Sequence, residues 1–176
     1  MSTIDFKEVQ GFKRRWVWLA LAAMNGLFIY AIVQQIFLGQ PFGSKPAPNY
    51  VLIIGELFFL LLLFFAAQIK LKTRITDTGI YYRFFPFQFK ETAIEWHELN
   101  DAYIRNYDSF HEYGGWGIRI GTAKRGNAIN TSASSSQGLQ LQFNDGKLFL
   151  IGTRRPGEIQ EIIDAVIASG KINRGV

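Results

Sequence analysis

The chain has 176 residues, a net charge of +5 and no cysteine. The lack of cysteine excludes disulfides, thiolate metal sites and cysteine nucleophiles. Hydrophobic residues make up an ordinary 48%, but residues 16–44 carry no charge and residues 46–69 carry only Glu56. Much of the positive charge flanks these apolar stretches, so we expect a lipid bilayer as a partner and no nucleic acid.

Residues 1–15 precede the first apolar stretch and contain four basic residues, Lys7, Lys13, Arg14 and Arg15. We expect this segment to be a basic cytoplasmic tail. Two apolar stretches follow, at about residues 16–38 and 50–69. Each is long enough for a helix to cross about 30 Å of hydrocarbon. The sequence therefore predicts a two-helix transmembrane hairpin over residues 16–69.

Two other interpretations of the apolar stretches are less favoured. A cleaved signal peptide has a shorter apolar core and a small-residue cleavage site after it. A buried soluble helix does not account for residues 57–65, which are apolar on every face in a chain too small to enclose them.

Basic residues predict the orientation of the hairpin. Lys70, Lys72 and Arg74 follow the second stretch, whereas the connection at residues 39–49 contains only Lys45. The positive-inside rule then places both termini in the cytoplasm and the connection outside the cell membrane.

The polar residues Asn25, Gln34, Gln35 and Glu56 lie inside the predicted spans. An antiparallel hairpin brings Glu56 to the depth of the two glutamines, so a hydrogen bond between them would fix the pairing of the helices. The alternative is a proton- or ion-handling site, because intramembrane acids are costly and often functional. We expect Asn25 to help packing, and Gly26 to allow close approach of the helices.

Residues 70–170 predict a soluble domain of about seven short strands. Asp77-Thr78-Gly79 and Asn144-Asp145-Gly146 are turn signals, each between two alternating segments. The candidate strands are residues 71–76, 80–85, 90–96, 101–107, 118–123, 128–131, 139–143 and 147–151.

A C-terminal helix should follow, beginning at Pro156 and ending near Gly170, with residues 171–176 as a tail. Its apolar residues repeat at helical spacing and form one stripe: Ile159, Ile162, Ile163, Val166 and Ile167. The stripe must pack against the preceding strands. The predicted fold class is thus a membrane helical hairpin plus an α+β domain.

Two segments carry a family resemblance: Gly115-Trp116-Gly117-Ile118-Arg119 and Ile151-Gly152-Thr153-Arg154-Arg155-Pro156. With the paired apolar helices ahead of them, they resemble bacterial membrane-anchored PH-like domain proteins. The resemblance implies an antiparallel PH-like barrel of about seven strands, capped by the C-terminal helix. It implies a fold and no particular activity.

Two sets of residues are candidates for binding. Phe84, Phe85, Phe87 and Phe89 exceed what one strand face buries, so they form a membrane-facing or partner-binding edge, or a strand pair covered on both faces. The candidates for lipid contact are the basic residues Lys70, Lys72, Arg74, Lys124, Arg125, Arg154 and Arg155. For the first three, simple positive-inside anchoring is the alternative.

Catalysis has little support, and we expect no enzyme activity, no metal and no cofactor. His111 and Glu112 beside Asp108 match no metal-ligand spacing. The leading hypothesis is a membrane-tethered PH-like module that recruits or stabilises partner proteins, either other membrane proteins or a second copy. The alternatives are lipid or small-ligand sensing by the domain, and a transporter or channel subunit that uses Glu56.

Overall fold

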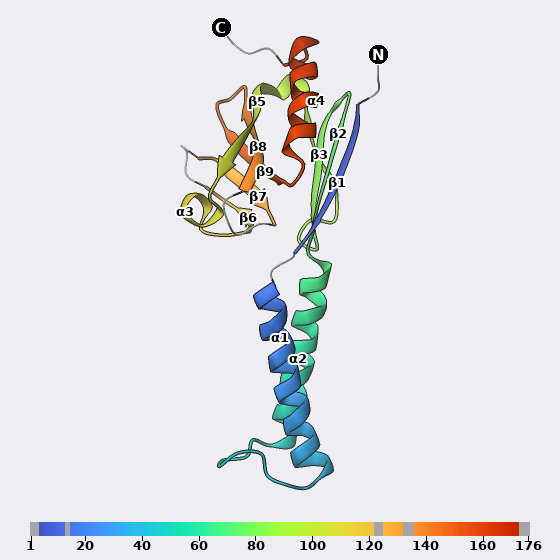
Figure 1. Ribbon diagram of the computed structural model, residues 1–176, viewed down its shortest axis with the longest axis vertical. Helices are drawn as coiled ribbons and strands as arrows, with labels where there is room; N and C mark the ends of the chain where they lie inside the picture. Colours follow the sequence, from blue (N-terminus) through green and yellow to red (C-terminus); the bar gives the residue numbers. More distant parts are fainter. Residues whose placement is uncertain (1–3, 13–14, 122–124, 132–135, 173–176) are drawn as a thin grey trace. The chain divides into compact units, whose positions relative to one another are not determined.

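The computed structural model describes residues 4–12, 15–121, 125–131 and 136–172. The chain divides into two compact units. One unit, Lys13–Gln68, contains a pair of helices. The other joins both ends of the chain, Met1–Phe12 and Ile69–Val176, in an α+β domain (Figure 1).

The helical unit consists of α1 (Arg15–Ile32), a π-helical turn (Val33–Phe37) and α2 (Asn49–Gln68). The two helices are long and apolar enough to cross a membrane, and only 11% of the most apolar window of each is buried. Such exposure is unlike a core helix of a soluble protein. The two predicted apolar helices are therefore confirmed, with ends within a residue or two of those expected.

Close packing between α1 and α2 centres on Phe28. Its ring lies 5.3 Å from the Phe59 ring, between centroids, and a Cβ at Gly55 would run into it. Gly26, where we expected the close approach, has no atom within 4 Å of such a Cβ. Gly55 thus takes the role that the sequence had suggested for Gly26.

The first sheet of the domain is antiparallel, in the order β1 (Asp5–Gly11), β2 (Lys70–Thr76), β3 (Gly79–Phe85) and β4 (Thr92–Glu95). Strand β1 lies in the segment that we expected to be a tail, and it pairs with β2 from Asp5↔Thr76 to Gly11↔Lys70. Its inward residues include Glu8 and Gln10, so the sequence lacks the apolar alternation that marks a strand.

The second sheet has five strands in the order β5 (Leu99–Tyr107), β8 (Ser136–Phe143), β9 (Leu148–Thr153), β7 (Asn127–Asn130) and β6 (Gly117–Arg119). Its neighbours are antiparallel except for the parallel pair β7 and β9. A 3-10 turn, Trp96–Glu98, leads into β5, and a short helix, α3 (Ser109–Tyr113), follows it.

The expected barrel of about seven strands is not what the described residues form. They form nine strands in two sheets, and no hydrogen-bonded ladder joins one sheet to the other. The ends of the two ladders are the edge strands β1, β4, β5 and β6. The sheets are instead connected by side chains and by the C-terminal helix, which a strand pattern alone cannot indicate.

Helix α4 (Pro156–Ala168) confirms the predicted C-terminal helix, and Ile159, Ile163 and Val166 of its stripe are buried. Contacts from α4 and from the residue segment just after it reach both sheets. The Ile104 amide of β5 donates to Gln160 Oε1 at 3.3 Å, and Lys171, just beyond α4, donates to the Asp77 carbonyl of the β2–β3 turn at 2.8 Å.

Polar side chains of β1 also join the sheets. Gln10 Nε2 donates to the Gly152 carbonyl at 2.6 Å. Glu8 accepts from the Thr153 hydroxyl at 2.8 Å and from the Arg154 amide at 2.9 Å. These buried bonds show what the Ile-Gly-Thr-Arg-Arg-Pro segment does: it attaches the N-terminal strand to the second sheet.

Candidate functional site

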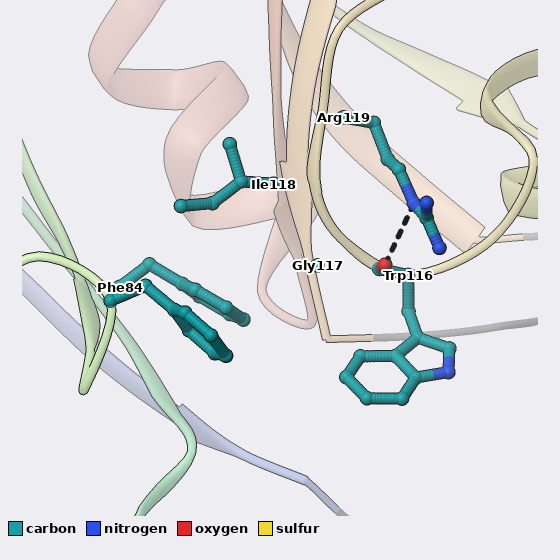
Figure 2. Close-up of a pocket in the computed structure, with 6 residues that line it drawn as sticks. Phe84, Trp116, Gly117, Ile118 and Arg119 are labelled. Atoms are coloured by element: carbon teal, nitrogen blue, oxygen red, sulfur yellow. Dashed lines mark hydrogen bonds between the residues drawn. The ribbon is translucent and has the colours of Figure 1, made fainter.

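A pocket of about 270 Å³ lies between the end of β3 and the edge strand β6. It is lined by Phe84, Phe87, Trp116, Gly117, Ile118 and Arg119. Figure 2 shows the Ile118 side chain pointing from β6 toward Phe84, while Arg119 lies on the other side of the strand, beside Trp116. The pocket therefore combines an apolar lining with one guanidinium.

The four predicted phenylalanines divide between core and surface. Phe84 is 1% exposed, whereas Phe87 and Phe89, in the loop after β3, are 65% and 75% exposed. The Phe84 and Phe87 rings stack with centroids 5.7 Å apart. Because Ile118 and Ile120 are exposed as well, apolar side chains continue from the pocket onto the surface. The surfaces of soluble proteins rarely expose contiguous apolar patches unless the patch binds a partner or a ligand.

The Gly-Trp-Gly-Ile-Arg segment builds the other wall of the pocket. Arg119 Nε donates to the Trp116 carbonyl at 2.9 Å, and the Trp116 ring lies 4.6 Å from that of Phe12. Gly117 has a φ of +98°, a conformation that side-chain-bearing residues rarely adopt. A Cβ at Gly115 would lie 2.8 Å from Arg119 Nη2. The two glycines thus permit the turn that presents Ile118 and Arg119.

The basic residues after the second helix all belong to β2. Lys70, Lys72 and Arg74 alternate with buried residues, so they share one face of the first sheet, which we call the outer face. The register adds two cations that were not among the predicted lipid-contact residues: Lys7 lies opposite Arg74, and Arg83 lies opposite Lys72. The sequence does not reveal which residues lie opposite each other on neighbouring strands, so it could not identify these two cations.

Three other basic candidates are bonded inside the domain. Arg125 Nη1 donates to the His111 carbonyl of α3 at 2.8 Å. Arg154 donates to the Gly11 carbonyl and Arg155 to the Lys7 carbonyl, both at 3.0 Å. These arginines have structural partners on α3 and β1. Lys124 lies outside the described residues.

The polar residues of the helix pair are not arranged as expected. Gln34 donates to the Tyr30 hydroxyl at 2.9 Å, and Gln35 donates to the Ala47 carbonyl at 2.7 Å. Glu56 is 8% exposed, and its Oε2 has no hydrogen-bond partner among the described residues. The glutamines therefore bond to their own helix and to the connecting loop, and the expected link to Glu56 is absent from the described contacts.

Asn25 is buried as well. Its amide donates to the Leu21 carbonyl of the same helix at 2.7 Å, while its Oδ1 has no partner among the described atoms.

The cluster around α3 is explained by helix capping. Asp108 Oδ1 accepts from the amides of Phe110 and His111 at 2.8 and 3.0 Å. Hydrogen bonds from the His111 backbone and ring hold the pKa of the Asp108 carboxyl below its usual value. In the described parts of the chain, no group of three or more His, Asp or Glu side chains could hold a metal ion.

Beside this helix, burial raises the pKa of Tyr107 to about 12 and also raises the pKa of Tyr113. Tyr113 is one partner of Arg105, which donates to its hydroxyl and to Glu112 Oε2, both at 2.8 Å. The cluster joins α3 to β5 through these buried and half-buried contacts.

The chain matches a known protein family. The family model described as "Family of unknown function (DUF6141)" matches residues 2–170, which include both helices, the pocket and the outer face. No curated protein matches the chain.

Proposed function

Because the chain belongs to a family of unknown function, DUF6141, we propose a function from its own residues: a non-enzymatic, membrane-anchored module that binds a segment of another membrane protein. Helices α1 and α2 form the anchor in the cell membrane, and the domain faces the cytoplasm with both termini. The observation that carries the proposal is the apolar pocket beside the edge strand β6.

The composition of the pocket supports a protein partner. Trp, Phe and Arg side chains are enriched at protein interfaces, and truncating them often costs the most binding energy. A volume of about 270 Å³ suits one or two large apolar side chains. Anchoring in the membrane also favours a partner in the same membrane, because it raises the effective concentration at which the two proteins meet.

Strand β6 suggests how the partner binds. It is the last strand of the second sheet and pairs only with β7 among the described strands. A free strand edge can accept an extended peptide, whose alternate side chains then enter pockets beside the edge. We propose that an extended segment next to a transmembrane helix of the partner pairs with β6 and places an apolar side chain against Ile118.

The pairing of Gly11 with Lys70 supports the proposed topology. These residues lie just before α1 and just after α2, so the chain enters and leaves the hairpin at one end of the same sheet. An even number of crossings and the basic residues beside both helices agree with cytoplasmic termini. The PH-like architecture stays a proposal, supported by the succession of short strands followed by one C-terminal helix.

Photocrosslinking in native membranes tests the proposal. A benzophenone amino acid is placed at Phe87 or Ile118, and at Phe110 of α3 as a control that is also half-exposed. We expect adducts with one membrane protein from positions 87 and 118, and none with that protein from position 110. Ile118→Asp should abolish the adduct formed from position 87.

The captured peptide should be an extended segment next to a membrane span. Adducts with lipid alone would overturn the proposal, as would adducts that survive Ile118→Asp. A cross-linked dimer of the chain would favour self-association instead.

A further inference from the structure

The outer face of the first sheet carries positive charge that nearby acids do not balance. Lys72 lies directly opposite Arg83, and Lys70 lies two residues from Lys72 on the same face. None of these three cations forms an ion pair within the described part of the chain. Like charges opposite each other destabilise a sheet, so an external anion would stabilise this arrangement.

The rows of the sheet differ in how their charge is compensated. In the row where Arg74 lies opposite Lys7, Arg74 pairs with Glu91 at 3.1 Å, and Lys7 pairs with Asp5 at 2.9 Å. The cations that pair with acidic side chains therefore lie farther along β2, and those without such ion pairs lie where β2 begins. The unbalanced charge is concentrated at one end of the sheet.

That end is also the end attached to the hairpin. Lys70 is the second residue after Gln68, the last residue of α2, and two residues span at most about 7 Å. Lys70 thus stays within that reach of the end of α2 in any orientation of the domain. Lys72 and Arg83 form the next row, about 7 Å farther along the strand.

The loop after β3 leaves from the same end, because Phe85 lies opposite Lys70. Arg83 Nη1 donates to the Phe89 carbonyl in this loop at 3.3 Å, which holds the guanidinium toward that end of the sheet. The exposed rings of Phe87 and Phe89 belong to the same loop. Cations next to exposed aromatic rings are typical of a surface that touches the membrane interface.

We propose that Lys70, Lys72 and Arg83 form a binding surface for the phosphate groups of anionic phospholipids in the leaflet where α2 ends. The inference rests on the proposed insertion of the hairpin, and none of the three cations lines the pocket. A base close to an anionic membrane surface strengthens the attraction about fivefold. The lipids thereby hold the sheet against the membrane.

Native mass spectrometry of the full chain in detergent tests this surface. Sedimentation with membranes after carbonate washing first establishes that the chain is inserted, separately from lipid specificity. The chain is then titrated with phosphatidylglycerol or phosphatidylcholine. We expect tighter binding of phosphatidylglycerol, weakened about fivefold by each of Lys70→Gln, Lys72→Gln and Arg83→Gln, with phosphatidylcholine binding unchanged.

Two variants complete the design. The double variant Lys70→Gln/Lys72→Gln leaves the Arg83–Phe89 bond in place, so it retains the fold even if the Arg83 variant does not. Lys147→Gln, in the exposed β8–β9 turn, is the matched control and should bind phosphatidylglycerol like the unaltered chain.

Four outcomes overturn the inference. They are equal binding of the two lipids, an unchanged preference in the double variant, an equal loss in the Lys147 control, and binding of free glycerol phosphate as tight as that of phosphatidylglycerol. The last result would identify a site for a soluble phosphate compound.

Discussion

Glu8 on the N-terminal strand accepts a hydrogen bond of 2.8 Å from the hydroxyl of Thr153, a residue 145 positions away in the sequence. Its other carboxylate oxygen accepts from the Arg154 amide at 2.9 Å. Glu8 is only 7% exposed, so these two donors take the place of water as hydrogen-bond partners of its carboxylate. One acidic side chain thus joins the first sheet to the second.

Glu8→Ala should lower the free energy of unfolding by about 1–3 kcal/mol, because it leaves a buried hydroxyl and a backbone amide without an acceptor. Thermal unfolding of the detergent-solubilised chain, followed by tryptophan fluorescence, measures the change. Asp5→Ala on the same strand removes an exposed carboxylate that pairs with Lys7, and it should have no measurable effect. Equal shifts in the two variants would refute the role of Glu8.

Gly152→Ala should destabilise the domain by about 1–3 kcal/mol, because the new methyl group has no room. Its Cβ would lie 2.7 Å from the Tyr107 hydroxyl oxygen and 2.9 Å from Asn130 Cβ. Gly157→Ala in the first turn of α4 meets no atom within 4 Å and should be stabilising by about 0.5–1 kcal/mol. The two melting temperatures should therefore move in opposite directions, and a parallel shift would contradict the close packing at Gly152.

Tyr107 should make the domain sensitive to alkali. Burial raises its pKa in the folded state to about 12, above the value of about 10 in an unfolded chain. The folded state holds the phenol proton more tightly, so this stability is complete below pH 10 and is lost as the pH rises to 12. The loss is about 2–3 kcal/mol. Denaturant unfolding from pH 9 to 12 should show a smaller loss for Tyr107→Phe, and an identical pH profile would contradict the assignment.

Gly55→Ala should loosen the helix pair, because the added methyl group would run into the Phe28 ring. Gln35 and Asn49, whose side chains bond at 2.8 Å, can report this in a chain without native cysteines. Gln35→Cys/Asn49→Cys should be cross-linked efficiently by a short bismaleimide, and less so with Gly55→Ala. Gly26→Ala, where the methyl group meets no atom within 4 Å, is the control and should leave the yield unchanged.

Features that local sequence encodes were predicted well. The two apolar helices follow from uninterrupted hydrophobic stretches, and α4 follows from its stripe and Pro156. The Asn144-Asp145-Gly146 turn forms as expected, with Gly146 at a φ of +81°. Each of these signals lies within a few residues of the element that it specifies.

Features that depend on distant partners were missed. Strand β1 has inward residues Glu8 and Gln10, whose burial is compatible with a strand only because Gly152, Thr153 and Arg154 supply partners. The division into two sheets and the parallel pairing of β7 with β9 also arise from tertiary contacts.

The candidate sites were predicted in part. The phenylalanine cluster and the cations of β2 were identified from the sequence. Ile118 and Arg119 belong to a segment that indicates only the family resemblance, and Lys7 and Arg83 were not among the predicted lipid-contact residues. Their positions depend on which strands become neighbours, and the register of a sheet is set by side-chain packing over the whole domain.

The pairing of β1 with β2 has a consequence for how the chain is made. Residues 5–11 leave the ribosome before their hydrogen-bonding partner, residues 70–76, which follows only after the whole helical hairpin. The first sheet is therefore incomplete until both helices have been synthesised. A fragment that starts at residue 70 would expose the edge of β2 and leave the donors of Thr153 and Arg154 without Glu8. The helical hairpin is inserted within the sequence of the domain, so the domain is complete only in a chain that carries the hairpin.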